Sequence, residues 1–126
     1  MELIRRCLLD TNAVIYLMGG RLALPLPDGR YSISIITEIE LLSVPGISIE
    51  EERKIRTLIF SLDRVHITNA VRDETISLRR KTRLKIPDAI IAATALTLRA
   101  VLVTNDQAFA AVEGLIVESL LLSSRG

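Results

Sequence analysis

Short apolar runs alternate along the chain with segments in which apolar residues recur at helical spacing. The runs that predict strands lie at about residues 4–9, 31–35, 65–68, 100–103 and 115–117. The segments that predict helices lie at about residues 13–18, 37–43, 48–62, 70–83, 87–99 and 107–112. Strands that alternate with helices are typical of βαβ units. The pattern therefore predicts an α/β protein whose parallel sheet is covered by helices on both faces.

Three of these segments have distinctive sequences. The helix that begins near residue 48 opens with a capping box, Ser48-x-x-Glu51, and its apolar residues between 55 and 62 recur at helical spacing. The helix over 87–99 is apolar nearly all round, which predicts deep burial. The strand over 100–103 is an unbroken apolar run, as expected near the centre of a sheet.

Composition narrows the class of protein. A chain of 126 residues forms one domain that buries about two-thirds of the surface of the unfolded chain. Aromatic residues make up 3% of the sequence, so recognition of nucleic acid by stacking bases on aromatic rings is not expected. The single cysteine, Cys7, lies in an apolar run and is predicted to be a small buried hydrophobe. Neither a signal peptide nor the roughly 18 apolar residues of a membrane span is found, so we expect a soluble, cytoplasmic protein.

Four acidic residues stand where a parallel α/β protein gathers its strand ends. Asp10 and Asp106 follow predicted strands, Glu40 lies early in a predicted helix, and Asp88 follows Pro87 at the start of the apolar helix. In an open parallel sheet, the strand C-termini and the N-termini of the connecting helices share one edge, where ligands bind. A right-handed crossover brings the start of the helix over 87–99 to that same edge. The four acids are therefore predicted to converge.

Each acid taken alone also has a structural explanation. Asp10 and Asp106 could cap the helices that follow them, and Asp88 could occupy a first helical turn, where the helix dipole favours an acid. Four caps would have no reason to converge on one edge, whereas clustered carboxylates repel one another and are stabilised by a cation. The set therefore predicts a divalent metal site.

Small polar residues flank the acids in the sequence. They are Thr11, Asn12, Thr37, Thr104 and Asn105. Such residues can orient carboxylates and waters around a metal ion. Turn and cap chemistry explains any one of them equally well, so both interpretations stay open here.

The ligand type indicates which metal. Four carboxylates, one cysteine and one histidine exclude a structural zinc site and favour Mg²⁺ or Mn²⁺. His66 falls inside the predicted strand over 65–68, so we interpret it as a structural residue. The sequence contains no Ser/His/Asp arrangement, no Walker loop and no GxGxxG motif. Attack of a metal-activated water on a phosphodiester is the chemistry that remains.

The basic residues are distributed unevenly along the chain. The net charge is only +1, yet five cations without an intervening acid precede the helix over 87–99: Arg79, Arg80, Lys81, Arg83 and Lys85. They could be solvated cations at a helix C-terminus, or they could attract the phosphate groups of a ligand. The sequence leaves both possibilities open.

Four segments together resemble the PIN-domain family. They read LLDTN at 8–12, ITEIELL at 36–42, IPDAIIAATAL at 86–96 and LVTNDQAF at 102–109, in the family's order and spacing. The resemblance covers the whole chain and is most specific in the third segment. The chain is similar in particular to the small VapC-type toxins of bacterial toxin–antitoxin pairs. It implies a three-layer α/β/α sandwich with a central, mainly parallel five-stranded sheet.

The resemblance also carries functional expectations. It implies Mg²⁺- or Mn²⁺-dependent endoribonuclease activity, Asp10, Glu40, Asp88 and Asp106 as catalytic metal ligands, and inhibition by a cognate antitoxin. The family's Thr-x-x-Glu-Leu pattern selects Glu40 over Glu38. A role in RNA processing, or as a catalytically silent interaction module, stays open. A phosphoacceptor receiver-like domain is disfavoured, because neither paired acids after the first strand nor a lysine after the fourth strand is present.

Apolar surface predicts a protein partner as well. The helix over 13–18 and the apolar residues between 55 and 62 offer more aliphatic surface than one face of a sheet requires. We therefore expect part of it to be covered in a homodimer or by an antitoxin segment.

Overall fold

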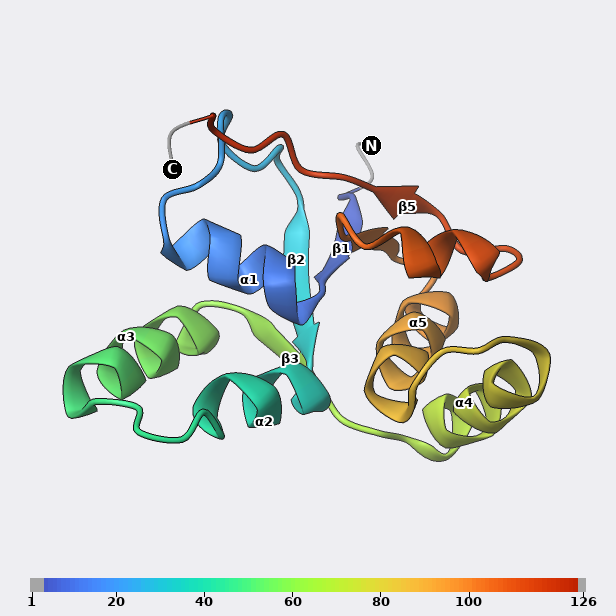
Figure 1. The fold of residues 1–126 in the computed structure, drawn as a ribbon. Helices are drawn as coiled ribbons and strands as arrows, with labels where there is room; N and C mark the ends of the chain where they lie inside the picture. Colours follow the sequence, from blue (N-terminus) through green and yellow to red (C-terminus); the bar gives the residue numbers. More distant parts are fainter. Residues whose placement is uncertain (1–3, 125–126) are drawn as a thin grey trace.

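The fold is an open α/β sheet flanked by helices, and the computed structural model describes residues 4–124 (Figure 1). The strands are β1 (Arg6–Leu9), β2 (Arg30–Ser34), β3 (Asp63–Val65), β4 (Val101–Val103) and β5 (Val117–Glu118). The helices are α1 (Thr11–Met18), α2 (Ile35–Leu42), α3 (Ile49–Phe60), α4 (Asn69–Lys81), α5 (Ile86–Leu98) and the 3₁₀ helix η1 (Gln107–Ala111). The alternation predicted from the sequence is confirmed.

The sheet has the strand order β3-β2-β1-β4-β5, and within residues 4–124 all its strand pairs are parallel. The α/β class and the five-stranded parallel sheet are therefore confirmed. β1 lies in the middle, and the chain adds β2 and β3 on one side of it before crossing to add β4 and β5 on the other. This reversal between β1 and β4 creates a crevice at the carboxyl ends of the two strands.

The bounds of two strands, β3 and β5, differ from the prediction. β3 spans 63–65 rather than 65–68, because it pairs with β2 only as far as the Ser34–Val65 pair, after which β2 gives way to α2. β5 spans 117–118 rather than 115–117, because the amide of Leu115 closes a turn on the carbonyl of Val112. His66 consequently lies beyond β3 and is exposed, so its predicted position inside that strand is wrong.

Helix boundaries also shift. α2 begins at Ile35, two residues earlier than predicted, because the Ser34 hydroxyl accepts a hydrogen bond from the Ile36 amide (3.1 Å) and caps the helix. Glu40 therefore lies in the second turn. α4 ends at Lys81, so residues 82–85 form a short connection to α5. The predicted cap of α3 is present, with the Ser48 hydroxyl accepting from the Glu51 amide (3.0 Å).

Helices cover both faces of the sheet, as the three-layer prediction requires. In Figure 1, α1, α2 and α3 lie on one side, and α4, α5 and η1 on the other. Cys7, Leu9 and Ile33 pack with α1 and α3, whereas Leu8 and Leu102 pack with α4 and α5. Every residue from 89 to 95 in α5 is buried, as its apolar sequence predicts. None of the helices within residues 4–124 has both the length and the apolar character needed to cross a membrane.

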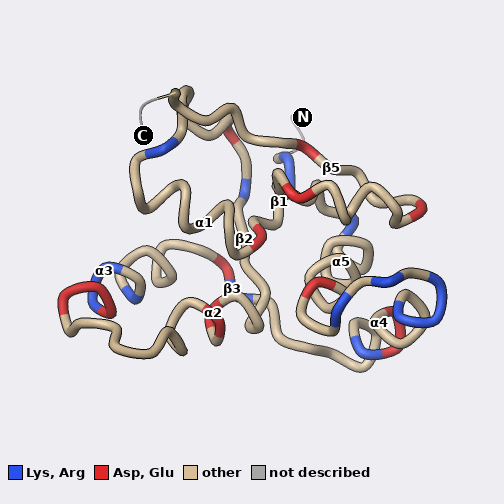
Figure 2. Tube along the Cα trace, viewed as in Figure 1, with Lys and Arg blue, Asp and Glu red and all other residues tan. Residues whose placement is uncertain are grey.

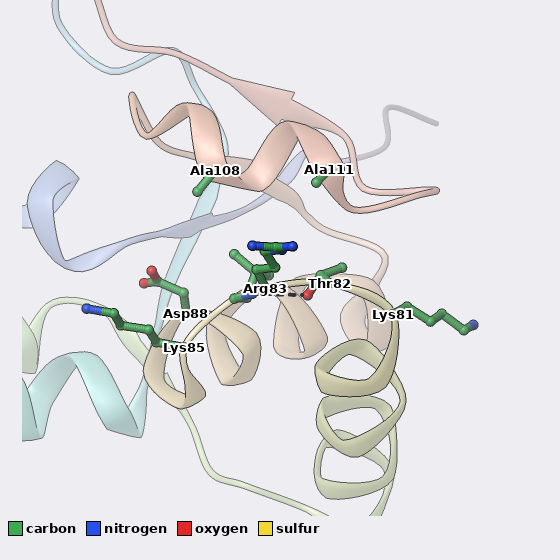
Figure 3. Close-up of a pocket in the computed structure, with 8 residues that line it drawn as sticks. Lys81, Thr82, Arg83, Lys85, Asp88, Ala108 and Ala111 are labelled. Carbon is green, nitrogen blue, oxygen red and sulfur yellow. Dashed lines mark hydrogen bonds between the residues drawn. The ribbon is translucent and has the colours of Figure 1, made fainter.

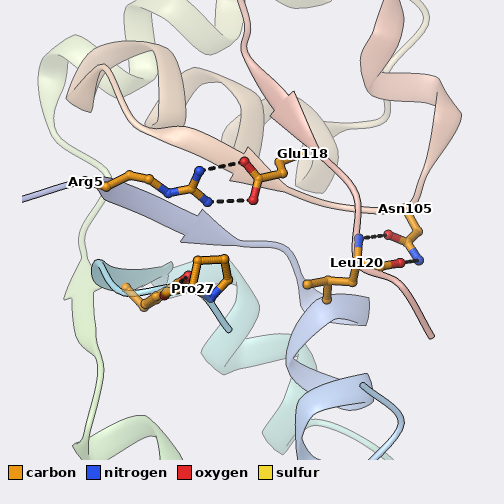
Figure 4. A network of polar contacts seen from close by, with 6 residues as sticks. Arg5, Pro27, Asn105, Glu118 and Leu120 are labelled. Atoms are coloured by element: carbon orange, nitrogen blue, oxygen red, sulfur yellow. Dashed lines mark hydrogen bonds and ion pairs between the residues drawn. The ribbon is translucent and has the colours of Figure 1, made fainter. Parts of the chain in front are cut away.

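Two polar contacts fix the segments that flank β4 (Figure 4). The Arg5 guanidinium donates to both carboxylate oxygens of Glu118, at 2.6 Å each, and so ties the start of β1 to β5. The Asn105 side chain bonds the backbone of Leu120 in both directions, at 2.6 and 3.1 Å. The turn after β4, which carries Asp106, is thereby held against the C-terminal segment.

Candidate metal centre

The four predicted acids lie at the carboxyl edge of the sheet, around the crevice between β1 and β4. Asp10 follows β1 directly, Asp106 lies in the turn after β4, Glu40 lies on α2, and Asp88 is in the first turn of α5. The charges of Asp106 and Glu40 both act on Asp10, and those of Asp106, Glu40 and Asp10 all act on Asp88. The fold therefore places all four acids within one electrostatic neighbourhood.

Asp10 is the buried member of the group, with 4% of its surface exposed. Its Oδ1 accepts a hydrogen bond from the Ala13 amide (2.7 Å), and its Oδ2 accepts one from the Thr104 hydroxyl. Burial raises the pKa of the Asp10 carboxyl, and the charges of Asp106 and Glu40 raise it further, while the two hydrogen bonds oppose the shift. Asp10 thus caps α1, as the structural explanation predicts, and it is also repelled by the charges of Asp106 and Glu40.

Asp106 and Glu40 are exposed and are held by neighbouring hydroxyl and amide groups. Asp106 accepts from the Ala108 amide (2.9 Å) and so caps η1, and its own amide donates to the Thr104 hydroxyl oxygen (3.0 Å). Thr104 therefore connects Asp10 with the Asp106 turn. Glu40 accepts from the Thr11 hydroxyl (2.6 Å), which also lies 3.1 Å from that of Thr37.

Asp88 differs from the other three because, among the described residues, no hydrogen bond holds its carboxylate. It is half-buried at the start of α5. Burial is the main cause that raises the pKa of the Asp88 carboxyl; Asp106, Glu40 and Asp10 raise it further, and Lys85 opposes them. Figure 3 shows the Lys85 side chain lying beside the Asp88 carboxylate. This acid is therefore available to an incoming cation.

The neighbouring acid Glu38 has a different role from Glu40. Its carboxylate accepts from the Arg64 guanidinium (3.0 Å) on β3, so its charge is already paired. Glu40 faces Thr11 and the other acids instead. The geometry is therefore consistent with the choice of Glu40 that the sequence motif makes.

The small polar residues near the acids divide into two groups. Thr11, Thr37 and Thr104 take part in the hydrogen bonds that hold Glu40 and Asp10. Asn105 binds the backbone of Leu120 instead, and Asn12 is exposed on α1. Thr11 and Thr104 thus bond carboxylates directly, and Thr37 bonds the Thr11 hydroxyl.

The donor set fits a hard divalent cation. It consists of carboxylate oxygens, which Mg²⁺ and Mn²⁺ prefer. Burial is the main cause that raises the pKa values of Asp10 and Asp88, and a cation would relieve the repulsion that adds to it. Within residues 4–124, no three acidic, histidine or cysteine side chains are close enough to hold one ion in their present conformations. Glu40 and Asp106 are exposed and Asp88 accepts no hydrogen bond among the described residues, so all three carboxylates could contribute oxygen atoms to an ion held beside the buried Asp10.

The predicted basic residues occupy the chain segment that leads into α5, and Lys85 is the one beside Asp88. Arg79, Arg80 and Lys81 occupy the last turn of α4, Arg83 and Lys85 the connection to α5, and all five are exposed. Figure 2 shows this blue segment running into the red start of α5. The Arg79 guanidinium is partly structural, because it donates to the Leu84 carbonyl (2.8 Å).

A pocket of about 580 Å³ joins the basic segment to the acidic edge. It is lined by Lys81, Thr82, Arg83, Leu84, Lys85, Asp88, Ala108 and Ala111 (Figure 3). The last two residues come from η1 and were not singled out in the sequence. Alanines in a short helix give no signal of their own, and only the packing of η1 against the α4–α5 connection reveals them.

The protein is therefore an open α/β fold with four acidic residues at the carboxyl edge of its sheet, at the point where the strand order reverses. The model of the PIN domain matches residues 7–115, and the chain belongs to the PIN domain family. No match is found among curated proteins.

Solved structures agree with this assignment. A toxin–antitoxin complex from Klebsiella pneumoniae contains a chain with 30% sequence identity and a TM-score of 0.72, over 87% of this chain and 95% of that one. VapBC-1 from nontypeable Haemophilus influenzae matches at 25% identity and a TM-score of 0.74, over 90% and 96% of the two chains. DNA-bound VapBC from Salmonella typhimurium, at 24% identity, shares the fold with a TM-score of 0.77, over 92% and 98%.

Proposed function

We propose that this protein is a divalent-metal-dependent endoribonuclease that hydrolyses RNA phosphodiester bonds, and that it is the toxin of a bacterial type II toxin–antitoxin pair. The observation that carries the proposal is the set of four acids, from four separate segments, that act on one another at the carboxyl edge of a PIN fold. Structural roles explain Asp10 and Asp106 as caps and Asp88 as an acid in the first turn of α5, but they give no reason for all four acids to meet at one edge.

In this proposal Asp10, Glu40, Asp88 and Asp106 hold Mg²⁺ or Mn²⁺. The bound ion supplies Lewis acidity at the phosphate and an activated water as nucleophile. Hydrolysis adds the water oxygen to phosphorus, breaks one P–O ester bond and leaves a proton on the departing oxygen. The Thr104 hydroxyl fixes the orientation of Asp10, and the Thr11 hydroxyl fixes that of Glu40.

The basic segment gives the acidic edge access to a polyanion. Four carboxylates alone would repel RNA, so cations must lie beside them for the strand to approach. Arg83 and Lys85 line the pocket that contains Asp88, and Lys85 opposes the effect of the other acids on it. We assign phosphate binding to the segment from Arg79 to Lys85.

We also propose an antitoxin partner and a homodimer. Similar solved structures include a toxin–antitoxin complex from Klebsiella pneumoniae and VapBC-1 from nontypeable Haemophilus influenzae. Ile15 on α1 and Ile39 on α2 are 50% and 52% exposed, which offers apolar surface to a partner. The contribution expected from the apolar residues of α3 differs, because Ile55 and Ile59 are buried in the core, whereas Phe60 and Ile49 are exposed.

Cleavage of labelled RNA tests the proposed activity. The purified chain is incubated with a mixed-sequence single-stranded RNA in Mg²⁺, Mn²⁺ or EDTA, together with Asp10→Asn and Asp88→Asn. Asp28→Asn is the matched control, because Asp28 is an exposed acid in the loop before β2, at the opposite edge of the sheet. We expect metal-dependent cleavage in wild type and control, and a loss of at least about 100-fold in both site variants.

The proposal fails if both site variants retain metal-dependent cleavage. It also fails if the wild type cleaves no RNA under any metal condition, since the function would then be binding alone. Removing bound antitoxin by denaturation and refolding before the assay excludes inhibition as the cause of an inactive preparation.

A further inference from the structure

The pocket beside Asp88 combines two kinds of surface that a phosphate site alone does not need. Its cations are Lys81, Arg83 and Lys85, and the remainder of its lining includes the apolar side chains of Leu84, Ala108 and Ala111. Cations on an open surface are sufficient to attract phosphates. A concave, partly apolar wall next to cations fits a ligand that has both a flat apolar part and an anionic part.

The pocket is also large enough for such a ligand. Its volume of about 580 Å³ lies inside the range of about 300–1,000 Å³ that small-molecule sites occupy. Alanines at 108 and 111 keep it open, because longer side chains at these positions of η1 would project into it. In Figure 3 both alanines face the α4–α5 connection, and the Arg83 guanidinium lies between the two.

The cations are arranged unequally around this space. Figure 3 shows Lys85 beside the Asp88 carboxylate, Arg83 extending toward η1, and Lys81 pointing away from Asp88 at the far end. A guanidinium plane can stack on a nucleobase, and this protein has few aromatic rings to do so. Lys85 is placed to meet a phosphate next to the acidic centre.

We propose that the pocket is a subsite for a single nucleotide of a single-stranded RNA, next to the phosphate that is cleaved. The base lies against Ala108 and Ala111 with Arg83 over it, and Lys85 binds the adjoining phosphate. The inference rests on the proposed function and deepens it, because it makes the enzyme sensitive to the base at one position. Base stacking on aromatic rings was not expected from the sequence, and this subsite requires none.

Binding measurements with a cleavage-blocked chain test the subsite. In an Asp10→Asn background with Mn²⁺, fluorescence anisotropy compares a labelled single-stranded RNA with a ribose-phosphate strand of the same length that carries no bases. Ala108→Leu fills the pocket without changing charge. Ala110→Leu is its matched control, because Ala110 is exposed on the same short helix and does not line the pocket. Arg83→Ala is compared in the same way with Arg53→Ala, an exposed cation on α3 that lies outside both the lining and the basic segment.

We expect the base-containing strand to bind at least about five-fold more tightly than the abasic one, on the scale of one stacked base. Ala108→Leu and Arg83→Ala should remove most of that preference, while Ala110→Leu and Arg53→Ala should keep it. Melting temperatures of Ala108→Leu and Ala110→Leu exclude misfolding as the cause.

The inference is overturned if Ala108→Leu binds and discriminates as Ala110→Leu does, or if the background chain binds no RNA. Cleavage separates this result from failure of the proposed function. Wild-type RNA cleavage together with equal cleavage by Ala108→Leu and Ala110→Leu would remove only the subsite. Absence of metal-dependent cleavage by the wild type would remove the proposed function itself.

Discussion

Neutralising Asp88 should stabilise the metal-free protein, because this acid carries a repelled charge that no hydrogen bond within the described residues compensates. Asp10, Asp106 and Glu40 each accept a hydrogen bond, so replacing them removes a bond together with a charge. Asp88→Asn changes the charge while keeping the size and shape of the side chain. It therefore isolates the electrostatic contribution of the acidic cluster.

The size of the effect follows from the groups that act on Asp88. Three acids raise its pKa and one cation, Lys85, opposes them, which leaves a net of two repulsive interactions. Screened interactions between charges near the surface are worth about 0.2–1 kcal/mol each, so removing the charge should stabilise the protein by about 0.4–2 kcal/mol. Partial burial adds to this gain, whereas loss of the favourable helix-dipole interaction subtracts about 0.3–1 kcal/mol.

Thermal and urea unfolding at pH 7 and low salt, in EDTA, measure this difference. Each kcal/mol corresponds to roughly 3–5 °C for a domain of this size. Asp28→Asn, at the opposite edge of the sheet, is the control for a change of net charge. Adding Mn²⁺ should then raise the melting temperature of the wild type by mass action and have less effect on Asp88→Asn.

The opposite sign would refute the reasoning. If Asp88 served only the dipole of α5, Asp88→Asn would melt at a lower temperature than the wild type in EDTA. Such a result, together with melting curves that do not respond to Mn²⁺, would mean that the acids are structural.

Three further predictions follow from the same contacts. Asp10→Ala should destabilise the metal-free protein by about 1–2 kcal/mol in urea, because it removes the cap of α1 and the hydrogen-bond partner of Thr104. Asp10→Asn should lose less stability, because it keeps an acceptor for the cap. The pKa values of Asp10 and Asp88 are raised in the folded protein, so the stability gained by protonating them is complete below the ordinary pKa of 3.8 and is lost as the pH rises through their folded-state values. The stability advantage of Asp88→Asn over the wild type in EDTA should therefore shrink on acidification toward pH 4. A constant advantage would contradict this linkage. Glu118→Gln should lower the stability measured in urea by about 0.5–1 kcal/mol, because it breaks the ion pair in which two hydrogen bonds join Glu118 to Arg5. The exposure of both side chains keeps this value small. Unchanged stability would show that the ion pair does not stabilise the fold.

Local sequence signals predicted much of the fold and the edge at which the acids lie. Asp10 and Asp106 could be placed because each follows an apolar strand, and the deep burial of α5 follows from its uniform apolar sequence. Placing Asp88 also required the right-handed crossover rule, and Glu40 required the family motif. These positions follow from the chain itself or from a general rule of topology.

Other features depend on partners far away in the sequence. β3 ends where β2 ends, so its bounds cannot be read from residues 63–68 alone. Asn105 resembles a residue of the acidic site, yet it binds Leu120, which is fifteen positions away and supplies only backbone groups. The pocket formed with Ala108 likewise arises from the packing of η1 beside the α4–α5 connection.

The central claim is that four acids at one sheet edge form a divalent metal site. A titration of Mn²⁺ into the purified chain, followed by electron paramagnetic resonance of the free ion, tests it directly. We expect saturable binding by the wild type and by Asp28→Asn, with strong loss of affinity in Asp10→Asn and in Asp88→Asn. Mn²⁺ that stays free in the presence of the wild type, or that binds all four proteins equally, would contradict it.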